Sequence, residues 1–476
     1  MKQGILNSLD WLTIWLYVIL VFIGIAFIYD TTYAPANPSF FNLDTSYGKQ
    51  TMFFVLSILV AIIIIVLDSK FYTTFAYIIF VLVLLLLVAV LIFGVEIKGS
   101  KSWFKFGSIA FQPAELAKFG TSLALAKFLS GYNVNLERFN DKVKAVVILL
   151  LPISLILLQG DVGSMLVFSS LVFLLHREGL ESPFLVIGLG SIFFSVMSLL
   201  YSPYVLLMCY SFILILFTYY NRKDKYPIVG VMLWIFIFVL VNILFAQFIL
   251  PILPTTFLFP YKILAAVFVV IFMVGFYIYR KSKPWLNLVL SVFVVVSIYT
   301  FSVDYLFNSV LKEHHRNRVN IILGKIHDPS NVGYNLEQSK IAIGSGGFVG
   351  KGYLKGTQTM LNYVPEQSTD FIFTSIAEEF GFIGSFMLIG LYVIFLLRLI
   401  YLAERQRSQF SRVYGYGVVS VFFIHFAINI AMTIGLAPVI GIPLPFISYG
   451  GSSLLSFTIL LFVFIRLDTQ RMEVLC

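Results

Sequence analysis

Long apolar runs separated by short polar gaps dominate the sequence. They recur at residues 11–29, 50–67, 71–93, 113–130, 144–158, 162–175, 371–400, 412–435 and 450–466, with about five more between 184 and 302. An α-helix needs about 20 apolar residues to cross the hydrocarbon core of a bilayer, and most of these runs come close to that length. The pattern therefore predicts an all-α, polytopic membrane protein with about fourteen membrane helices.

One long polar segment, residues 304–370, interrupts this pattern. Lys, Arg, His, Asp, Glu and Gly accumulate there, and the segment ends with Asp370 directly before an apolar run. Ionisable groups at membrane depth are costly and usually functional, so a carboxylate at the mouth of a membrane helix is a candidate for chemistry. The alternative role for Asp370 is to cap the helix that follows, with Thr369 as another candidate cap.

Composition and charge agree with a membrane protein. Hydrophobic residues make up 60% of the chain and charged residues 12%, which excludes a soluble globule. The net charge of +9 does not indicate a nucleic-acid partner, because most Lys and Arg fall in short gaps between apolar runs. By the positive-inside rule these gaps are cytoplasmic, so we expect both termini in the cytoplasm and the 304–370 loop outside.

The first apolar run, residues 11–29, has two interpretations. Ala34-Pro35-Ala36 resembles a small-residue cleavage site, which would make the run a signal peptide. Its length suits a membrane helix better than a signal-peptide core, so we expect an uncleaved signal anchor.

Three ionisable residues fall within or between apolar runs. Glu115 and Lys118 are three apart in one run, so they lie on one helical face and can pair. The pair either only fixes the fold or lines a polar cavity in which Lys118 meets a phosphate. Asp161 follows an apolar run and precedes another, where it either caps a helix or serves the same cavity.

Two further segments are candidates for ligand contacts. Lys101 and Lys105 flank Trp103 in a short gap expected on the outer side, where cations would meet an anionic lipid phosphate or would simply be tolerated surface charge. Residues 443–453, which include Ser448, are rich in Pro and Gly. They predict irregular backbone at membrane depth, which is tolerated only where protein or a wet cavity surrounds it.

Taken together, these motifs resemble the SEDS family of peptidoglycan polymerases (shape, elongation, division and sporulation). The resemblance rests on Lys101-Ser102-Trp103-Phe104, Gln112-Pro113-Ala114-Glu115-Leu116-Ala117-Lys118, Gly160-Asp161-Val162-Gly163-Ser164, Tyr334-Asn335-Leu336-Glu337-Gln338-Ser339, Gly344-Ser345-Gly346-Gly347, Gly350-Lys351-Gly352, Pro365-Glu366-Gln367-Ser368-Thr369-Asp370 and Pro445-Phe446-Ile447-Ser448-Tyr449-Gly450-Gly451-Ser452. The chain resembles the elongation members more than the division members. It departs from the family at Gly160, where the family usually has Pro, and between 185 and 298, where it has about four additional helices.

The resemblance implies a family-like core of about ten membrane helices, and it divides the chain into five parts. These are core helices in 1–183, inserted helices in 184–284, a core helix in 285–303, an extracytoplasmic catalytic loop in 304–370 and core helices in 371–476. We expect this arrangement in the bacterial cytoplasmic (inner) membrane.

The resemblance also implies polymerisation of lipid II. The 4-hydroxyl of one disaccharide would attack the anomeric carbon of another, which a diphosphate links to a polyprenyl lipid. Inversion in one displacement requires a base and charge stabilisation for the leaving diphosphate. Asp370 matches the family's catalytic aspartate and would be that base.

For the diphosphate, the sequence offers several groups without choosing among them. The candidate substrate-binding or cavity-lining residues are Trp103, Lys101, Lys105, Glu115, Lys118, Asp161, Arg316, Arg318, Gln338, Lys340 and Ser448. A divalent cation such as Mg²⁺ or Mn²⁺, held by Asp161, Glu115 or Asp370, would serve the same purpose.

The expected partners are lipid II, the growing glycan strand, a class B penicillin-binding transpeptidase and other membrane proteins of cell elongation. Two other functions use the same features. A lipid II flippase would need polar residues at both faces, whereas here they collect at the outer face. A non-catalytic scaffold of the elongation machinery would not need Asp370.

Overall fold

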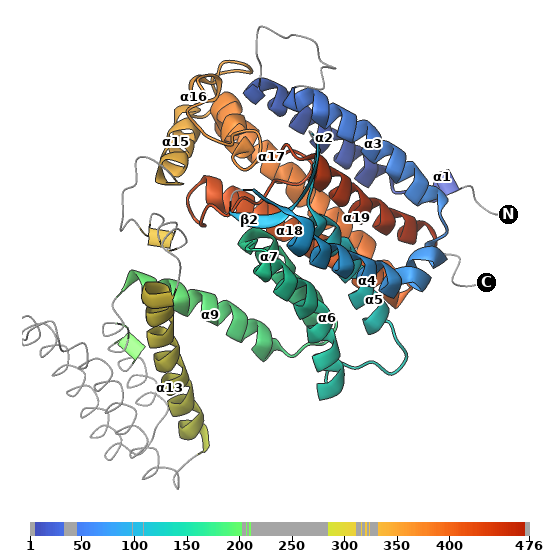
Figure 1. Cartoon of the computed structure of the whole chain (residues 1–476), viewed down its shortest axis with the longest axis vertical. Helices are drawn as coiled ribbons and strands as arrows, with labels where there is room; N and C mark the ends of the chain where they lie inside the picture. Colours follow the sequence, from blue (N-terminus) through green and yellow to red (C-terminus); the bar gives the residue numbers. More distant parts are fainter. Residues whose placement is uncertain are drawn as a thin grey trace, which may run out of the picture. The chain divides into compact units, whose positions relative to one another are not determined.

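The computed structural model describes residues 5–32, 45–97, 99–107, 109–201, 206, 209–210, 284–310, 316, 319–320, 323 and 332–471. Two compact units are present, residues 1–185 with 327–476 and residues 186–326, and each is described by itself (Figure 1). Arg318 and most of the predicted insertion at 184–284 lie outside the described residues.

The first unit is a helical bundle whose long helices agree closely with the apolar runs, whereas α1, α15 and α16 lie outside them. They are α1 (Ile5–Ser8), α2 (Trp11–Thr32), α3 (Ser46–Val66), α4 (Ser69–Phe93), α5 (Pro113–Leu129), α6 (Phe139–Leu158), α7 (Val162–Ser169), α8 (Leu171–Arg177), α15 (Val332–Ser345), α16 (Thr357–Met360), α17 (Ile372–Glu404), α18 (Gln409–Thr433) and α19 (Gly451–Thr469). Helix α9 (Ser182–Leu200) crosses the boundary in sequence, and α13 (Pro284–Tyr305) with the π-helical turn η2 (Leu306–Val310) belongs to the second unit. Among the described helices, seven are long and apolar enough to cross a membrane, so the all-α, polytopic prediction is confirmed.

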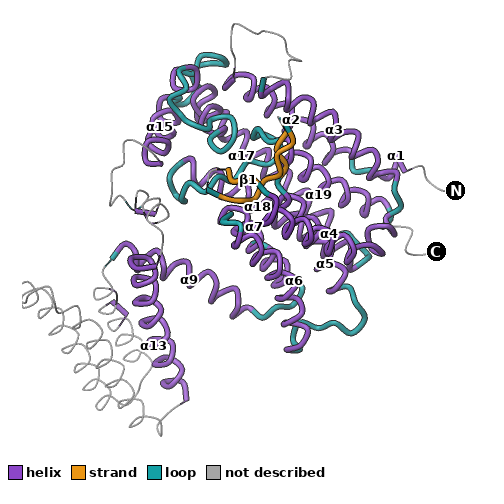
Figure 2. The backbone as a smooth tube through the Cα atoms, viewed as in Figure 1, coloured by secondary structure: helices purple, strands orange, loops and turns teal. Residues whose placement is uncertain are grey.

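The gap that carries Trp103 is a small antiparallel sheet, which the sequence interpretation missed (Figure 2). Its strands, in the order β1-β2-β3, are β1 (Val95–Ile97), β2 (Ser100–Phe106) and β3 (Ile109–Phe111). Gly99 and Gly107, at φ of +82° and +61°, lie in the two tight connections, where positive φ suits glycine. The pairing of β1 with β2 is irregular between Val95 and Glu96.

Helix α5 lies at the centre of the bundle and packs against α4, α6, α18 and α19. Nearly all of its residues are buried, and many are Gly, Ala, Ser or Thr. Small residues let membrane helices approach closely. At one such approach, a side chain placed on Gly417 of α18 would begin only 3.1 Å from the Ser122 hydroxyl of α5.

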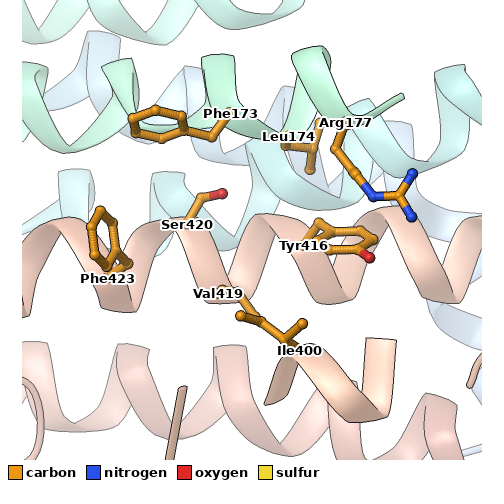
Figure 3. Close-up of a pocket in the computed structure, with 8 residues that line it drawn as sticks. All are labelled: Phe173, Leu174, Arg177, Ile400, Tyr416, Val419, Ser420 and Phe423. Atoms are coloured by element: carbon orange, nitrogen blue, oxygen red, sulfur yellow. The ribbon is translucent and has the colours of Figure 1, made fainter. Parts of the chain in front are cut away.

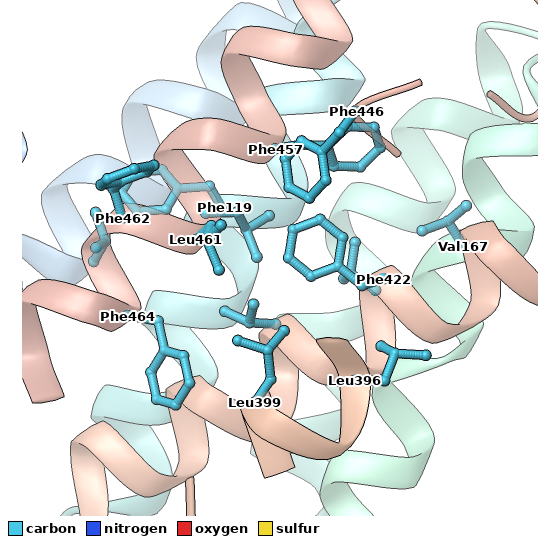
Figure 4. Packing of buried hydrophobic residues seen from close by; sticks show 14 of the residues in the cluster. Phe119, Val167, Leu396, Leu399, Phe422, Phe446, Phe457, Leu461, Phe462 and Phe464 are labelled. Carbon is cyan, nitrogen blue, oxygen red and sulfur yellow. The ribbon is translucent and has the colours of Figure 1, made fainter. Parts of the chain in front are cut away.

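Aromatic side chains fill the core between α18, α19 and the segment that joins them (Figure 4). The rings of Phe422, Phe446 and Phe457 have centroids 5.2–5.9 Å apart. Phe446 belongs to the Pro- and Gly-rich segment, which is non-helical and buried at this point. The prediction that protein surrounds this irregular backbone is confirmed.

The second unit is described only in part. There α9 and α13 pack together through the Ser198 hydroxyl, which donates to the Thr300 carbonyl at 2.8 Å, and the Tyr299 hydroxyl, which donates to the Ser191 carbonyl at 3.1 Å. These contacts bear out two of the five apolar runs expected between 184 and 302 as helices.

Candidate active site

Asp370 lies in a tight turn immediately before α17, with its side chain half-buried. Its backbone N–H and that of Phe371 both donate to the Glu366 carbonyl, at 3.1 and 3.2 Å. Phe371 occupies the capping position of α17, and its side chain makes no capping hydrogen bond. The Thr369 hydroxyl donates to the carbonyl and the carboxylate of Glu366, at 3.2 and 3.0 Å.

Polar contacts from α18 and the 443–450 segment hold this turn in place. The Ser448 hydroxyl donates to the Thr369 carbonyl at 2.5 Å, and the Tyr449 N–H donates to the Ser368 carbonyl at 2.8 Å. The Asn429 side-chain amide donates to the Asp370 carbonyl at 3.0 Å. Ser448 is buried and fully engaged, since its oxygen also accepts the Leu444 N–H at 2.8 Å, so it positions the turn of Asp370.

Glu115 and Lys118 form the predicted pair, with 2.7 Å between the carboxylate and the ammonium. Both are buried, and Lys118 is only 1% exposed. The Lys118 Nζ atom also lies 2.8 Å from Nε2 of His425. Since an ammonium can only donate, Nε2 accepts, and Nδ1 therefore carries the proton that faces the Pro443 carbonyl at 3.2 Å.

Asp161 caps α7, as one of its two interpretations predicts. Its carboxylate accepts the backbone N–H of Ser164 at 3.0 Å, the Ser164 hydroxyl at 2.8 Å and the Gln112 amide at 2.6 Å. Gln112 directly precedes α5, so Asp161 joins the start of α7 to the start of α5. Asp161 is also close enough to Lys118 to interact with it electrostatically.

The backbone of residues 440–443 brings these groups together. A side chain on Gly163 would begin 3.1 Å from the Ile440 carbonyl, and one on Gly441 would begin 3.5 Å from Oδ2 of Asp370. The Ile442 carbonyl accepts a hydrogen bond from Asn429 at 2.8 Å. Residues 440–443 therefore contact Asp370, the start of α7 and, through the Pro443 carbonyl, His425.

Trp103, Lys101 and Lys105 all lie on β2, and the pairing of β2 with β1 is irregular between Lys101 and Trp103. Both lysines are exposed and Trp103 is half-buried. The Lys101 backbone N–H donates to the Gln159 carbonyl at 2.9 Å, which places the sheet against the turn between α6 and α7. That turn contains Gly160 at φ +76°, a conformation that the ring of the family's usual proline could not adopt.

On α15, Lys340 is exposed and Gln338 is half-buried. The intervening Ser339 is buried and anchors α15, with its oxygen 2.7 Å from the Thr374 hydroxyl and 2.9 Å from the Thr433 carbonyl.

Arg316 belongs to the second unit, where its guanidinium donates to the Asn308 carbonyl at 3.2 Å. Among the described residues, no group of three or more His, Cys, Asp or Glu side chains is placed to hold a metal. Asp161 and Glu115 are instead engaged by Ser164 and Lys118.

A cavity of about 210 Å³ lies between α8, α17 and α18 (Figure 3). Apart from Ser420 and Tyr416, its lining is apolar except for Arg177, which pairs with Glu404 at 3.0 Å. It contains none of the predicted site residues, and Ile400 in its wall lies far along α17 from Asp370. We therefore do not place the active site there.

Comparison with known proteins identifies the family. The model of the FtsW/RodA/SpoVE family, described as a cell cycle protein family, matches residues 10–212 and 253–473. This chain belongs to that family. The resemblance inferred from the motifs is confirmed, and the unmatched residues 213–252 fall inside the range expected to be inserted.

Relatives and solved structures agree with this family. The peptidoglycan glycosyltransferase RodA of Treponema pallidum (strain Nichols) is 30% identical over 470 residues, which cover 94% of each chain. The peptidoglycan glycosyltransferase MrdB of Escherichia coli (strain K12) is 39% identical over 180 residues, covering 38% of this chain and 48% of MrdB.

The same fold occurs in a chain of a peptidoglycan synthase complex that coordinates polymerization and crosslinking, with a TM-score of 0.62, 24% identity and coverage of 98% of this chain and 99% of that one. It also occurs in the rod shape determining protein RodA of Thermus thermophilus, with a TM-score of 0.52, 20% identity and coverage of 98% of both chains.

Sequence reasoning missed two members of the site, His425 and Asn429. They are four residues apart, so they share one face of α18. Polar side chains within an apolar helix at this spacing were the available signal. Their partners Lys118 and Asp370 are distant in sequence, so spacing alone could not identify the contacts.

Proposed function

We propose that this chain is a peptidoglycan glycosyltransferase that polymerises lipid II into glycan strands during cell elongation, with Asp370 as its general base. Family membership and the activity named for the relatives support the reaction class. Asp370 accepts the proton of the acceptor's 4-hydroxyl while that oxygen bonds to the anomeric carbon of the donor. The bond from this carbon to the diphosphate oxygen breaks, and the polyprenyl diphosphate leaves with the electron pair.

The observation that carries this proposal is the way Asp370 is held. Its main chain is fixed by Glu366 and Asn429, and the preceding residues are fixed by Ser448 and Tyr449. The carboxylate stays half-exposed beside residues 440–443. A fixed backbone with an accessible carboxylate suits a base that must meet a substrate hydroxyl within hydrogen-bonding distance.

The exposed cations on β2 and α15 are our candidates for the diphosphate. Lys101, Lys105 and Lys340 are exposed, as charge stabilisation of a departing lipid diphosphate requires. Trp103 and Gln338 lie beside them in sequence, and Arg316 and Arg318 remain candidates. Lys118 has a different role, because it is buried between Glu115 and His425. It positions the 440–443 segment through His425.

The proposed setting is the bacterial cytoplasmic membrane, with both termini in the cytoplasm and Asp370 outside. Glycan strands made there must be crosslinked, so we propose a class B penicillin-binding transpeptidase as partner, together with other membrane proteins of cell elongation. The similarity of fold to a chain of a peptidoglycan synthase complex supports a partner of this kind.

The decisive experiment is a gel assay for glycan strands made from purified lipid II by the purified chain with its cognate transpeptidase. We expect polymer from the wild type and a turnover about 10²–10⁴-fold lower from Asp370→Asn, because the amide keeps the shape but accepts no proton. Thermal unfolding of both proteins serves as the folding control.

Near-wild-type turnover of Asp370→Asn would contradict the base assignment. A folded wild type that makes no polymer would favour a flippase or a scaffold. Translocation of lipid II in liposomes would then separate these two functions.

A further inference from the structure

Two buried carboxylates outside the active site contact each other. Asp30 lies in the last turn of α2 and is 4% exposed, and Glu379 lies early in α17 and is 1% exposed. Helices α2 and α17 pack side by side, and the two carboxyl groups interact directly. Within the described part of the chain, neither oxygen of Asp30 has a hydrogen-bond donor, and neither does Oε2 of Glu379.

The neighbouring basic group does not neutralise this pair. Lys351 lies 2.7 Å from Glu378, the residue before Glu379, and donates to it. Glu378 is saturated, because the Thr359 hydroxyl and the backbone N–H groups of Gln358 and Thr359 also donate to it, at 2.8–3.0 Å. Glu378 therefore has a cation and several donors, whereas in Glu379 only Oε1 has a donor, the Gly356 N–H at 3.3 Å, and Asp30 has no donor among the described residues.

Two adjacent carboxylates with no cation and with a hydrogen-bond donor to only one of their four oxygens, among the described residues, are not stable as a buried dianion. Each loses its hydration, and at low effective dielectric the two charges repel strongly. Burial, together with the nearby charges of Asp30 and Glu379, raises the pKa of Tyr353 to about 12. The Tyr353 phenol accordingly stays protonated and donates to the Ala26 carbonyl at 2.9 Å.

We propose that Asp30 and Glu379 bind a hydrated divalent cation of the Mg²⁺ class, which enters from the outer face. The donor set consists of carboxylate oxygens, which such hard cations prefer, and Mg²⁺ commonly binds through one or two carboxylates while it keeps several waters.

The loop of residues 351–356 covers Glu379, since its Gly356 N–H donates to Oε1 of Glu379, and it gives the cation a route. Tyr353 and Lys355 in this loop are exposed, and α16, which follows it, contacts both α2 and α17. Entry from outside rests on the proposed orientation of the chain.

The cation would act on the catalytic turn without touching the reacting atoms. The Gln367 amide donates to the carbonyls of Thr31 and Thr359, at 3.0 and 3.1 Å. Gln367 therefore joins the end of α2, next to Asp30, to α16, and it lies three residues before Asp370. A cation between α2 and α17 would hold this framework together.

The test uses the full chain in detergent, stripped with EDTA, with thermal unfolding followed by tryptophan fluorescence as MgCl₂ is added. We expect a saturable rise in Tm for the wild type and for Glu137→Gln, which removes an exposed carboxylate elsewhere. Asp30→Asn and Glu379→Gln should need at least about tenfold more Mg²⁺, the loss that even an outer-shell partner can cause. Without Mg²⁺, both variants should unfold at or above the wild-type temperature, because one repelling charge is gone.

Several outcomes would overturn the proposal. A rise in Tm with Mg²⁺ that persists unchanged in Asp30→Asn would indicate an adventitious ion only. A wild-type Tm that does not change with Mg²⁺ but falls as the pH rises would indicate a proton shared by the Asp30 and Glu379 carboxyl groups. If the variants do not fold, the number of Mn²⁺ ions bound by the wild type can be measured by electron paramagnetic resonance. Less than one bound ion per chain would contradict the proposed site. None of these measurements uses lipid II, so the outcome is independent of the proposed polymerase activity.

Discussion

At the residue scale, the site depends on a buried charge pair that the spacing predicted and on partners that it could not predict. Glu115 and Lys118 are three apart on one helix, so their pairing is a local property of the sequence. His425 lies on another helix, where its Nε2 accepts a hydrogen bond from Lys118 and its Nδ1 donates to the Pro443 carbonyl. Such a contact follows from helix packing, which is why the sequence left open whether Lys118 meets a phosphate.

This arrangement predicts that Lys118 stabilises the fold because its positive charge compensates the buried carboxylate of Glu115. Lys118→Met leaves Glu115 buried without a cation and should lower the free energy of unfolding by about 3–5 kcal/mol. Glu115→Gln keeps an acceptor for Lys118 and should cost less, about 1–3 kcal/mol. Unfolding in mixed micelles measures both.

The double variant Glu115→Gln with Lys118→Met is the control, because it buries no charge. It should recover much of the loss caused by Lys118→Met alone. A double variant whose loss equals the sum of the two single losses would show that the pair is not coupled.

At the element scale, the helices were predictable and the sheet was not. Apolar runs of membrane-spanning length determine where α2, α3, α4, α17, α18 and α19 lie, and the structure agrees closely. The strands at Val95–Phe111 are too short to show a clear periodicity, and their charged residues suggested an ordinary loop.

Contact between α2 and the irregular segment depends on a glycine. A side chain on Gly24 would begin 2.7 Å from Cα and from the carbonyl oxygen of Ile447. Gly24→Ala should therefore push α2 away and destabilise the fold by about 1–3 kcal/mol, as overpacking does. The lost packing lies next to Ser448, so polymer formation should also fall.

Gly390→Ala on α17 is the matched control, since a side chain there meets nothing within 4 Å. Its stability should stay the same or rise by about 0.4–1 kcal/mol. Equal destabilisation by the two substitutions, measured as unfolding in the same detergent, would contradict the packing argument for Gly24.

At the scale of the whole molecule, charge separates the two ends of the first unit. Ion pairs gather where α17 ends and α2 begins: Arg398 with Asp10, Arg405 with Asp468, Arg412 with Glu178 and Arg177 with Glu404. Asp370 and the start of α17 lie at the opposite end. A basic end with short loops is the cytoplasmic end under the positive-inside rule, which supports Asp370 outside.

Orientation can be measured with single cysteines at the two ends. In a background with Cys209→Ser and Cys476→Ser, Lys355→Cys should react with a membrane-impermeant maleimide in intact cells, because Lys355 is exposed in the loop over Glu379. Glu137→Cys, exposed in the turn between α5 and α6, should react only after lysis. The reverse pattern would place Asp370 in the cytoplasm, where an acceptor strand outside could not reach it. It would also close the outer route to Asp30 and Glu379, so one labelling experiment tests the geometry on which both proposals depend.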